Sequence, residues 1–224
     1  MENKGIAELF SSIAQRYNLL NHILSLGLDF HWRAKTIKEI SPEKHEKILD
    51  ICAGTGDLSA LALKYGAKPL ALDLSYSMLK IARKRLKNLP VVLGNALRLP
   101  FRERSFDAAV MGFGLRNLKD PASGIREAYR VLRPGGRLAI LEFSPEPSWF
   151  LRPFYMLYLK KLVPLLGGLI TGKREAYLHL SHSIESFLKP REVIELMERT
   201  GFSVNYFKLT MGTVVLYIGK KEEQ

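Results

Sequence analysis

Two acids flanking a pair of glycines form the stretch of this sequence with the clearest chemistry. Asp50 ends a short apolar run, Gly54 and Gly56 follow it, and Asp73 lies near the end of a second apolar run. Glycines allow a backbone to approach a ligand closely, and the free N–H groups at the start of the following helix can face that ligand. A carboxylate in the position of Asp73 can accept hydrogen bonds from both hydroxyls of a ribose. The stretch therefore predicts a site for a nucleoside cofactor.

The spacing of these residues also distinguishes between cofactors. The dinucleotide fingerprint has a third glycine three residues after the second, where this chain has Ser59. The order Asp-x-x-x-Gly-x-Gly resembles instead the S-adenosylmethionine (SAM) loop of the seven-stranded methyltransferases, which folds around a zwitterionic methionine. A glycine turn with a purely structural role is the alternative. Asp50 and Asp73 together favour a cofactor site over that alternative.

Composition limits the class of protein. At 224 residues and 47% hydrophobic content, the sequence is typical of one globular domain. The single cysteine, Cys52, is predicted to fill space in the glycine loop and suits a reducing compartment. No apolar signal core or membrane-spanning run is found, so we expect a cytoplasmic protein. The net charge of +12 is compatible with nucleic acid, anionic lipid or an acidic substrate, and composition does not choose among them.

The periodicity of apolar residues predicts alternating strands and helices. The expected strands are Ile48–Ile51, Pro69–Leu74, Pro90–Leu93, Phe106–Met111, Arg137–Phe143, Val204–Leu209 and Thr213–Gly219. The last two are separated by a short turn and must be antiparallel neighbours, because a parallel crossover needs about a dozen residues or more. We therefore predict an α/β fold: a seven-stranded, mostly parallel Rossmann-like sheet of the methyltransferase type with an antiparallel C-terminal hairpin.

Two segments depart from this alternation and divide the chain. A helical leader, residues 1–42, precedes the SAM-binding core of residues 43–148. A lid or substrate-binding insertion, residues 149–189, separates that core from its C-terminal helix and hairpin, residues 190–224. The leader is predicted to contain three helices, Ala7–Arg16, Leu19–Leu26 and Asp29–Ile40, with Asp29 as the N-cap of the third. Its polar residues indicate either a cover over a substrate or simple packing.

Two sequence blocks carry a resemblance to a specific family. The first runs from Tyr17 to Arg33 and contains Tyr-Asn-x-x-Asn and His-Trp-Arg; the second contains Gly-Leu-Arg-Asn-Leu-x-Asp, from Gly114 to Asp120. Arg-Val-Leu-Arg-Pro-Gly-Gly-Arg and Leu-Glu-Phe follow the second block. With them the chain resembles the ubiquinone/menaquinone biosynthesis C-methyltransferases over nearly its whole length. The resemblance implies SAM as cofactor and methylation of a ring carbon of a polyprenylated quinol.

The chain departs from the family pattern at three positions. Asn18 stands where the family usually has Asp, His179 where it has Tyr, and Gly112 where it often has Ser. The last two are expected where substrate and cofactor meet. The sequence thus leaves open whether the ring is a naphthoquinol, as in demethylmenaquinol, or a benzoquinol, as in ubiquinone biosynthesis.

The resemblance also implies the site residues. The expected cofactor contacts, which include the residues of the glycine loop, are Asp50, Gly54, Thr55, Gly56, Asp73, Asn95 and Ala96. The expected substrate contacts are Tyr17, Asn21 and Tyr177. Arg116 is expected to stabilise a phenolate, since a guanidinium stays protonated in proteins and is therefore a poor base. His179 is better suited to accept a proton, with a packing histidine as the alternative. No metal site is expected.

The partners follow from the same reasoning. An RNA or DNA methyltransferase and a non-catalytic SAM-binding subunit are the rival interpretations. Enzymes that methylate amino groups commonly have Asp/Asn-Pro-Pro-Tyr where this chain has Met-Gly-Phe-Gly after the fourth strand, so no nucleic acid partner is expected. Residues 149–174 mix aromatic and apolar side chains with cations and predict either a lid or a peripheral membrane contact. A homo-oligomer is compatible with the sequence.

Overall fold

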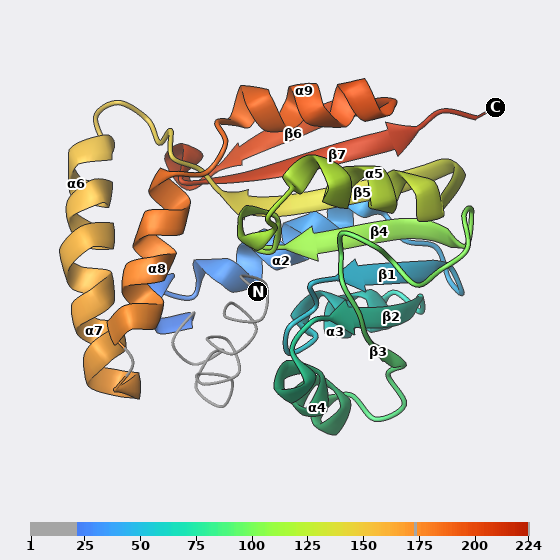
Figure 1. Cartoon of the computed structure of the whole chain (residues 1–224), viewed down its shortest axis with the longest axis horizontal. Helices are drawn as coiled ribbons and strands as arrows, with labels where there is room; N and C mark the ends of the chain where they lie inside the picture. The colour runs from blue at the N-terminus through green and yellow to red at the C-terminus, as the bar shows by residue number, and fades with distance from the viewer. Residues whose placement is uncertain (1–21, 173, 224) are drawn as a thin grey trace.

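The computed structural model describes residues 22–172 and 174–223, and in these ranges it contains one mixed seven-stranded sheet (Figure 1). The strands lie in the order β3-β2-β1-β4-β5-β7-β6, with β7 antiparallel to both of its neighbours. Their bounds are β1 Lys47–Ile51, β2 Lys68–Asp73, β3 Val91–Leu93, β4 Phe106–Gly112, β5 Leu132–Phe143, β6 Phe202–Leu209 and β7 Val214–Lys221. The predicted α/β fold and its C-terminal hairpin are confirmed.

The fifth strand is longer than its predicted range. Helix α5 (Pro121–Val131) passes directly into β5, which begins at Leu132 rather than at Arg137. The Pro-Gly-Gly sequence lies inside the strand, where Gly135 has a φ of +73°. The pairing register with β4 shifts between Phe106 and Ala108, so the extra residues are accommodated as an irregularity of the ladder.

Helices cover both faces of the sheet. Alternate residues of each strand point to opposite faces, so Ala109 and Met111 of β4 join one core and Ala108 and Val110 the other. Helices α5 and α9 (Pro190–Thr200) pack on the first face, which lies nearer the viewer in Figure 1. The helices α2 (Leu28–Ile40), α3 (Asp57–Lys64) and α4 (Tyr76–Arg85) pack on the second.

The strand order reverses between β1 and β4, and this determines where a ligand can bind. The connections from β1 and β4 leave in opposite directions along the sheet and open a crevice at the carboxyl edge of the parallel strands. The glycine loop follows β1, and the loop bearing Arg116 follows β4 through the short helix η1 (Leu115–Asn117). The two predicted catalytic and cofactor segments therefore share one edge.

Residues 152–171 and 174–185, which belong to the insertion predicted as a lid, are helical and lie beyond that edge, at the left of Figure 1. Helix α6 (Arg152–Leu157) continues through a π-helical turn, η2 (Tyr158–Leu162), into α7 (Val163–Thr171), and α8 (Arg174–Glu185) runs back beside α7. A Cβ on Gly167 would lie 2.2 Å from the Tyr177 ring, so glycine allows α7 and α8 to pack closely. Tyr177 to Ile184 belongs to α8 and is separate from α9, which the sequence had not distinguished.

The leader differs from the prediction at its helix start. Helix α2 begins after Gly27, whose φ of +78° is the left-handed conformation that glycine favours. Asp29 lies inside the helix, so its predicted role as N-cap is wrong. Its carboxylate accepts hydrogen bonds from Ser25 at 2.7 Å and also contacts the Arg33 guanidinium. The predicted helix Ala7–Arg16 and most of Leu19–Leu26 lie outside the described residues. No helix in the described ranges is long and apolar enough to span a membrane.

Candidate active site

The loop between β1 and α3 leaves open space beside its first glycine. Gly54 has a φ of +55°, and a Cβ placed there would meet nothing within 4 Å. Gly56, with a φ of +82°, precedes α3, while a Cβ on Gly114 of the neighbouring loop would lie 2.7 Å from the Cys52 Cβ. Burial and nearby acids raise the pKa of the Cys52 thiol, so this residue is a packing group rather than a nucleophile. The two loops thus approach closely and leave Gly54 free to face a ligand.

Two carboxylates hold this loop in shape. The Asp73 carboxylate accepts hydrogen bonds from the Gly54 N–H and the Ser75 N–H, both at 2.8 Å. Asp50 accepts from the Ser59 N–H at 3.0 Å and from its hydroxyl at 2.7 Å. Burial raises the pKa of Asp73, and burial with the nearby negative charges of Asp57 and Asp73 raises the pKa of Asp50 to about 7. A cationic ligand nearby would therefore stabilise the ionised form of either acid.

The remaining predicted cofactor residues lie at the same edge. The Thr55 carbonyl accepts a hydrogen bond from Arg85 Nη1 at 2.8 Å, within the glycine loop. After β3, the Asn95 carboxamide oxygen accepts from the Leu97 N–H at 2.9 Å and closes a turn, and Ala96 is buried beside it. The open glycine, the acid that can accept from a ribose and the second buried acid fit SAM. That cofactor would bring an electrophilic methyl group on a sulfonium to this edge.

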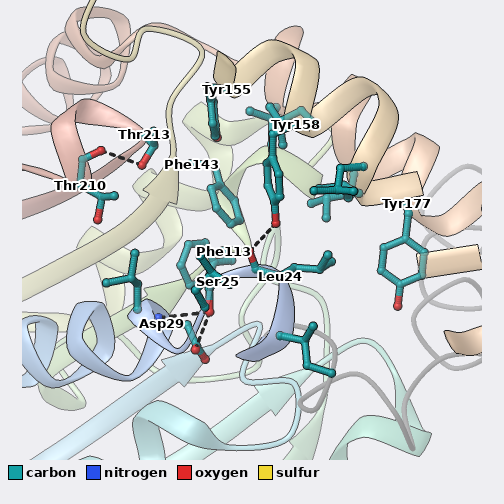
Figure 2. A pocket seen from close by; sticks show the side chains of 18 of the residues that line it. Leu24, Ser25, Asp29, Phe113, Phe143, Tyr155, Tyr158, Tyr177, Thr210 and Thr213 are labelled. Carbon is teal, nitrogen blue, oxygen red and sulfur yellow. Dashed lines mark hydrogen bonds between the residues drawn. The ribbon is translucent and has the colours of Figure 1, made fainter. Parts of the chain in front are cut away.

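A cavity of about 570 Å³ lies between α2, the lid and the loop after β4 (Figure 2). Most of the side chains that line it are apolar, from Ile23, Leu24 and Leu28 in the leader to Leu159, Val163 and Leu166 in the lid. Tyr177, predicted as a substrate contact, is among them. Tyr17 and Asn21, the other two predicted contacts, lie outside the described residues. The cavity therefore suits an apolar ligand that carries few polar groups.

Three aromatic rings form one wall of the cavity. Trp32 lies 6.2 Å from Phe113 and from Phe143, edge-on to both, and the Phe113 and Phe143 centroids are 4.7 Å apart. The Arg116 guanidinium lies over the Phe143 ring at 5.3 Å. The Trp32 Nε1–H donates to Thr210 Oγ1 at 2.8 Å, which attaches the leader to the end of β6. A planar ligand could stack on this wall.

Arg116 is held by a residue that sequence reasoning did not select. Its Nη1 donates to Glu142 Oε1 and to the Phe113 carbonyl, both at 2.7 Å, and its backbone N–H donates to Glu142 Oε2 at 3.2 Å. Glu142 is fully buried on β5, and the Arg116 side chain is only 4% exposed. Glu142 belongs to the Leu-Glu-Phe motif that contributes to the family resemblance, but only the fold brings it opposite Arg116. The guanidinium is thus fixed in direction rather than free.

His179 lies on α8 and lines the same cavity as Arg116. Burial and the positive charge of Arg116 hold the pKa of the His179 imidazole below its usual value. The imidazole is therefore neutral near pH 7 and able to accept a proton. In the described ranges, no group of three or more His, Cys, Asp or Glu side chains is arranged to hold a metal ion.

A second ionic network, also absent from the prediction, joins the leader to the glycine loop. Arg33 is buried and pairs with Asp29 of its own helix and with Asp57 at 3.6 Å. Asp57 pairs in turn with Arg85 at 2.9 Å, and Arg85 holds the Thr55 carbonyl. These contacts connect the leader, which lines part of the apolar cavity, with the glycine loop.

Sequence comparison finds similar proteins over almost the whole chain. The model of the ubiE/COQ5 methyltransferase family matches residues 1–221. The chain is 43% identical to the demethylmenaquinone methyltransferase of Thermotoga maritima, with 96% of each chain covered. It is 40% identical to the enzyme of the same name from Thermus thermophilus (95% of this chain, 100% of that one). It is 39% identical to the ubiquinone/menaquinone biosynthesis C-methyltransferase UbiE of Haemophilus ducreyi (96% and 87%).

Solved structures support the fold. A SAM-dependent methyltransferase from Thermotoga maritima is similar with a TM-score of 0.70 at 23% identity, covering 96% of this chain and 99% of that one. The [4+2]-cyclase SpnF is similar with a TM-score of 0.72 at 13% identity, covering 98% and 96%. A methyltransferase and a cyclase thus share one architecture, so the fold alone does not decide the reaction.

The raised pKa of Asp50 makes SAM affinity depend on pH. A cationic ligand beside Asp50 lowers that pKa, so below pH 7 binding must release a proton and affinity falls by up to about tenfold per pH unit. In Asp50→Asn the side-chain oxygen still accepts from Ser59 but no longer ionises. Calorimetry from about pH 5 to about pH 8 should show a steeper loss for the wild type than for the variant. Parallel curves would remove Asp50 from the linkage, because Asp73 and the ligand amine titrate in both proteins.

Proposed function

The chain belongs to the ubiE/COQ5 methyltransferase family, and we propose that it methylates a ring carbon of a polyprenylated quinol, demethylmenaquinol being the first candidate. It is a SAM-dependent methyltransferase of the seven-stranded class. The observation that carries the choice of substrate is the largely apolar cavity beside the glycine loop, with the Arg116 guanidinium and the neutral His179 imidazole in its walls. Such walls fit an uncharged ring with a hydrocarbon tail better than a polyanionic nucleic acid.

Methylation at carbon requires the ring to become a nucleophile. When a ring hydroxyl loses its proton, the phenolate directs electron density onto the neighbouring ring carbon. Bound SAM would supply the methyl group for the new C–C bond, and its sulfur would keep the electron pair of the broken S–C bond; the ring hydrogen would then leave as a proton. His179 is the group proposed to take the hydroxyl proton, because its neutral form is favoured.

Arg116 and the aromatic wall have separate roles in this proposal. Arg116 lies at the carboxyl edge and supplies the fixed positive charge that stabilises the phenolate. Trp32, Phe113 and Phe143 exclude water and hold the ring plane, so that the reacting carbon faces the glycine loop. The energetic advantage is preorganisation, since Glu142 keeps the guanidinium in place before the charge develops.

The proposal is tested by direct methyl transfer. The purified chain, supplied with SAM and a chemically reduced demethylmenaquinol, should yield a product with one additional methyl group on a ring carbon. A benzoquinol precursor is tested in parallel as the second candidate substrate. It is included because the name of the UbiE relative from Haemophilus ducreyi contains both quinones. No transfer to either quinol by protein that binds SAM would refute the proposed function.

Arg116→Lys tests the role of the guanidinium. Lysine keeps the charge and can still pair with Glu142, but it loses the rigid fork that contacts Glu142 and the Phe113 carbonyl together. We expect turnover to fall by about 100-fold while SAM affinity is nearly unchanged. Arg126→Lys, an exposed arginine on α5, is the matched control. A variant with the wild-type rate would exclude Arg116 from the chemical step.

The outer surface of the lid supports a peripheral membrane contact as part of the proposal. Its exposed apolar side chains include Trp149 (86%), Leu169 (74%) and Leu165 (56%), with further ones at Phe150, Leu157 and Leu178. Phe154 and Leu162 are also exposed but line the cavity. A polyprenyl tail is too apolar to diffuse through water, so an enzyme that uses it gains by meeting it at a bilayer. Aromatic and aliphatic groups can enter the bilayer interface while cations meet anionic headgroups.

Exposed cations on this surface allow the proposed membrane contact to be tested by charge reversal. Arg152 and Lys161 are exposed, whereas Lys160 pairs with Glu185 at 2.8 Å and is less suited to mutation. Arg152→Glu/Lys161→Glu should reduce sedimentation with anionic vesicles severalfold, because each cation contributes roughly 1 kcal/mol near such a surface. The same charge change at the exposed Lys84 and Lys87, in and just after α4, is the control. Helix α4 lies at the bottom of Figure 1, away from the lid. Equal loss in both variants would indicate attraction by net charge alone.

A further inference from the structure

Most polar groups in the cavity wall already have partners. The Ser25 hydroxyl donates to Asp29 at 2.7 Å, and the Thr213 hydroxyl donates to the Thr210 carbonyl at 2.9 Å (Figure 2). Tyr158 donates to the Leu24 carbonyl, which attaches the lid to the leader. These groups are satisfied within the protein and are not available to hold a polar ligand without breaking a bond.

Three buried polar atoms in the same wall have no hydrogen-bond partner among the described residues. They are the Tyr155 hydroxyl, the His179 Nε2 and the Arg116 Nε. They come from α6, α8 and η1, three elements that each contribute to the lining of this cavity. Leaving a buried donor or acceptor unpaired is unfavourable, so a set of such atoms in one cavity indicates a ligand that pairs with them. Arg116 and His179 already have proposed roles; Tyr155 has none.

We infer that Tyr155 is a substrate-binding residue whose hydroxyl donates a hydrogen bond to the reacting ring oxygen of the quinol, beside the Arg116 guanidinium. This inference rests on the proposed function and assigns a contact within its site. The two donors would share the negative charge that develops on one oxygen, as paired donors do in an oxyanion hole. Tyr155 thereby helps to decide which ring oxygen, and so which ring carbon, reacts.

The surroundings of the phenol suit a donor. Burial raises the pKa of Tyr155 above its usual value, whereas the charge of Arg116 partly opposes that rise. The hydroxyl therefore keeps its proton throughout the working pH range. Tyr155 also packs against the hydrophobic cluster that Phe143 contacts, and Phe143 lies under the Arg116 guanidinium. The phenol and the guanidinium both line the same cavity as Phe143.

Tyr158 provides an internal comparison on the same continuous helical segment. Three residues after Tyr155, it lines the same cavity, but its hydroxyl donates to the leader backbone. A Tyr→Phe change removes only the hydroxyl in each case. Loss of the Tyr158 hydroxyl breaks a bond within the protein, whereas loss of the Tyr155 hydroxyl removes an unpaired buried group. The Tyr158 variant should therefore lose stability, whereas the Tyr155 variant should keep its stability and lose activity.

The test measures three quantities for Tyr155→Phe in the full-length chain. The ligand-free Tm should be unchanged or raised, because an unpaired buried hydroxyl is removed. The dissociation constant for SAM should equal that of the wild type. The kcat/KM for the reduced demethylmenaquinol should fall by about 10- to 100-fold. Tyr158→Phe should instead lower the Tm. A purely structural tyrosine would not combine retained stability with lost turnover.

The outcomes separate this inference from the proposed function. If the wild type methylates the quinol and Tyr155→Phe has a kcat/KM within about twofold of it, the Tyr155 contact is refuted and the proposed function stands. A Tm that falls together with SAM affinity would assign Tyr155 a structural role and also refute the contact. If the wild type methylates no quinol while binding SAM, both proposals fail together.

Discussion

The carboxyl edge of the parallel strands depends on one fully buried carboxylate. Glu142 lies inside β5, where an unpaired charge would be strongly unfavourable, and it accepts hydrogen bonds from the Arg116 side chain and from the backbone N–H groups of Arg116 and Phe143. Removing one partner of such a buried pair typically costs about 3–5 kcal/mol, because the other charge is left uncompensated. The loop after β4 is therefore tied to the central sheet. The positions of Phe113 and Phe143 in the cavity wall follow from that attachment.

Around this fixed centre, the two binding regions are joined by charge rather than by packing alone. The chain of ion pairs from Asp29 through Arg33 to Asp57 and Arg85 ends at the glycine loop. The leader also contacts the lid through Tyr158 and the C-terminal hairpin through Trp32. A ligand in the apolar cavity thus lies under a cover whose other contacts hold the cofactor loop. This is a physical reason for the leader to carry polar residues among apolar ones.

The sequence was sufficient where the determinants are local. The glycine loop, Asp73 and the antiparallel hairpin were predicted because apolar periodicity and turn length express them within a few dozen residues. The partner of Arg116 and the network through Arg33 were not, since side chains on separate elements meet only when the sheet order is known. The Asp29 prediction was wrong for a related reason: Gly27 begins the helix in a left-handed conformation, and the carboxylate turns instead to Arg33. The role proposed for Tyr155 could not be predicted, because this residue lies in an interrupted apolar segment without a recognisable pattern.

The position of the antiparallel strand has a consequence for how the chain folds. Leu49 of β1 pairs with Leu70 of β2, so that half of the sheet forms from contacts close in sequence. Leu141 of β5 pairs with Leu216 of β7 only after the lid, α9 and β6 have been bridged. Closing so long a loop is entropically unfavourable until the ladder forms, and high contact order slows folding. We expect nucleation around β1 and β2, with the free edge of β5 covered last, so this edge is the one most open to wrong pairing in a newly made chain.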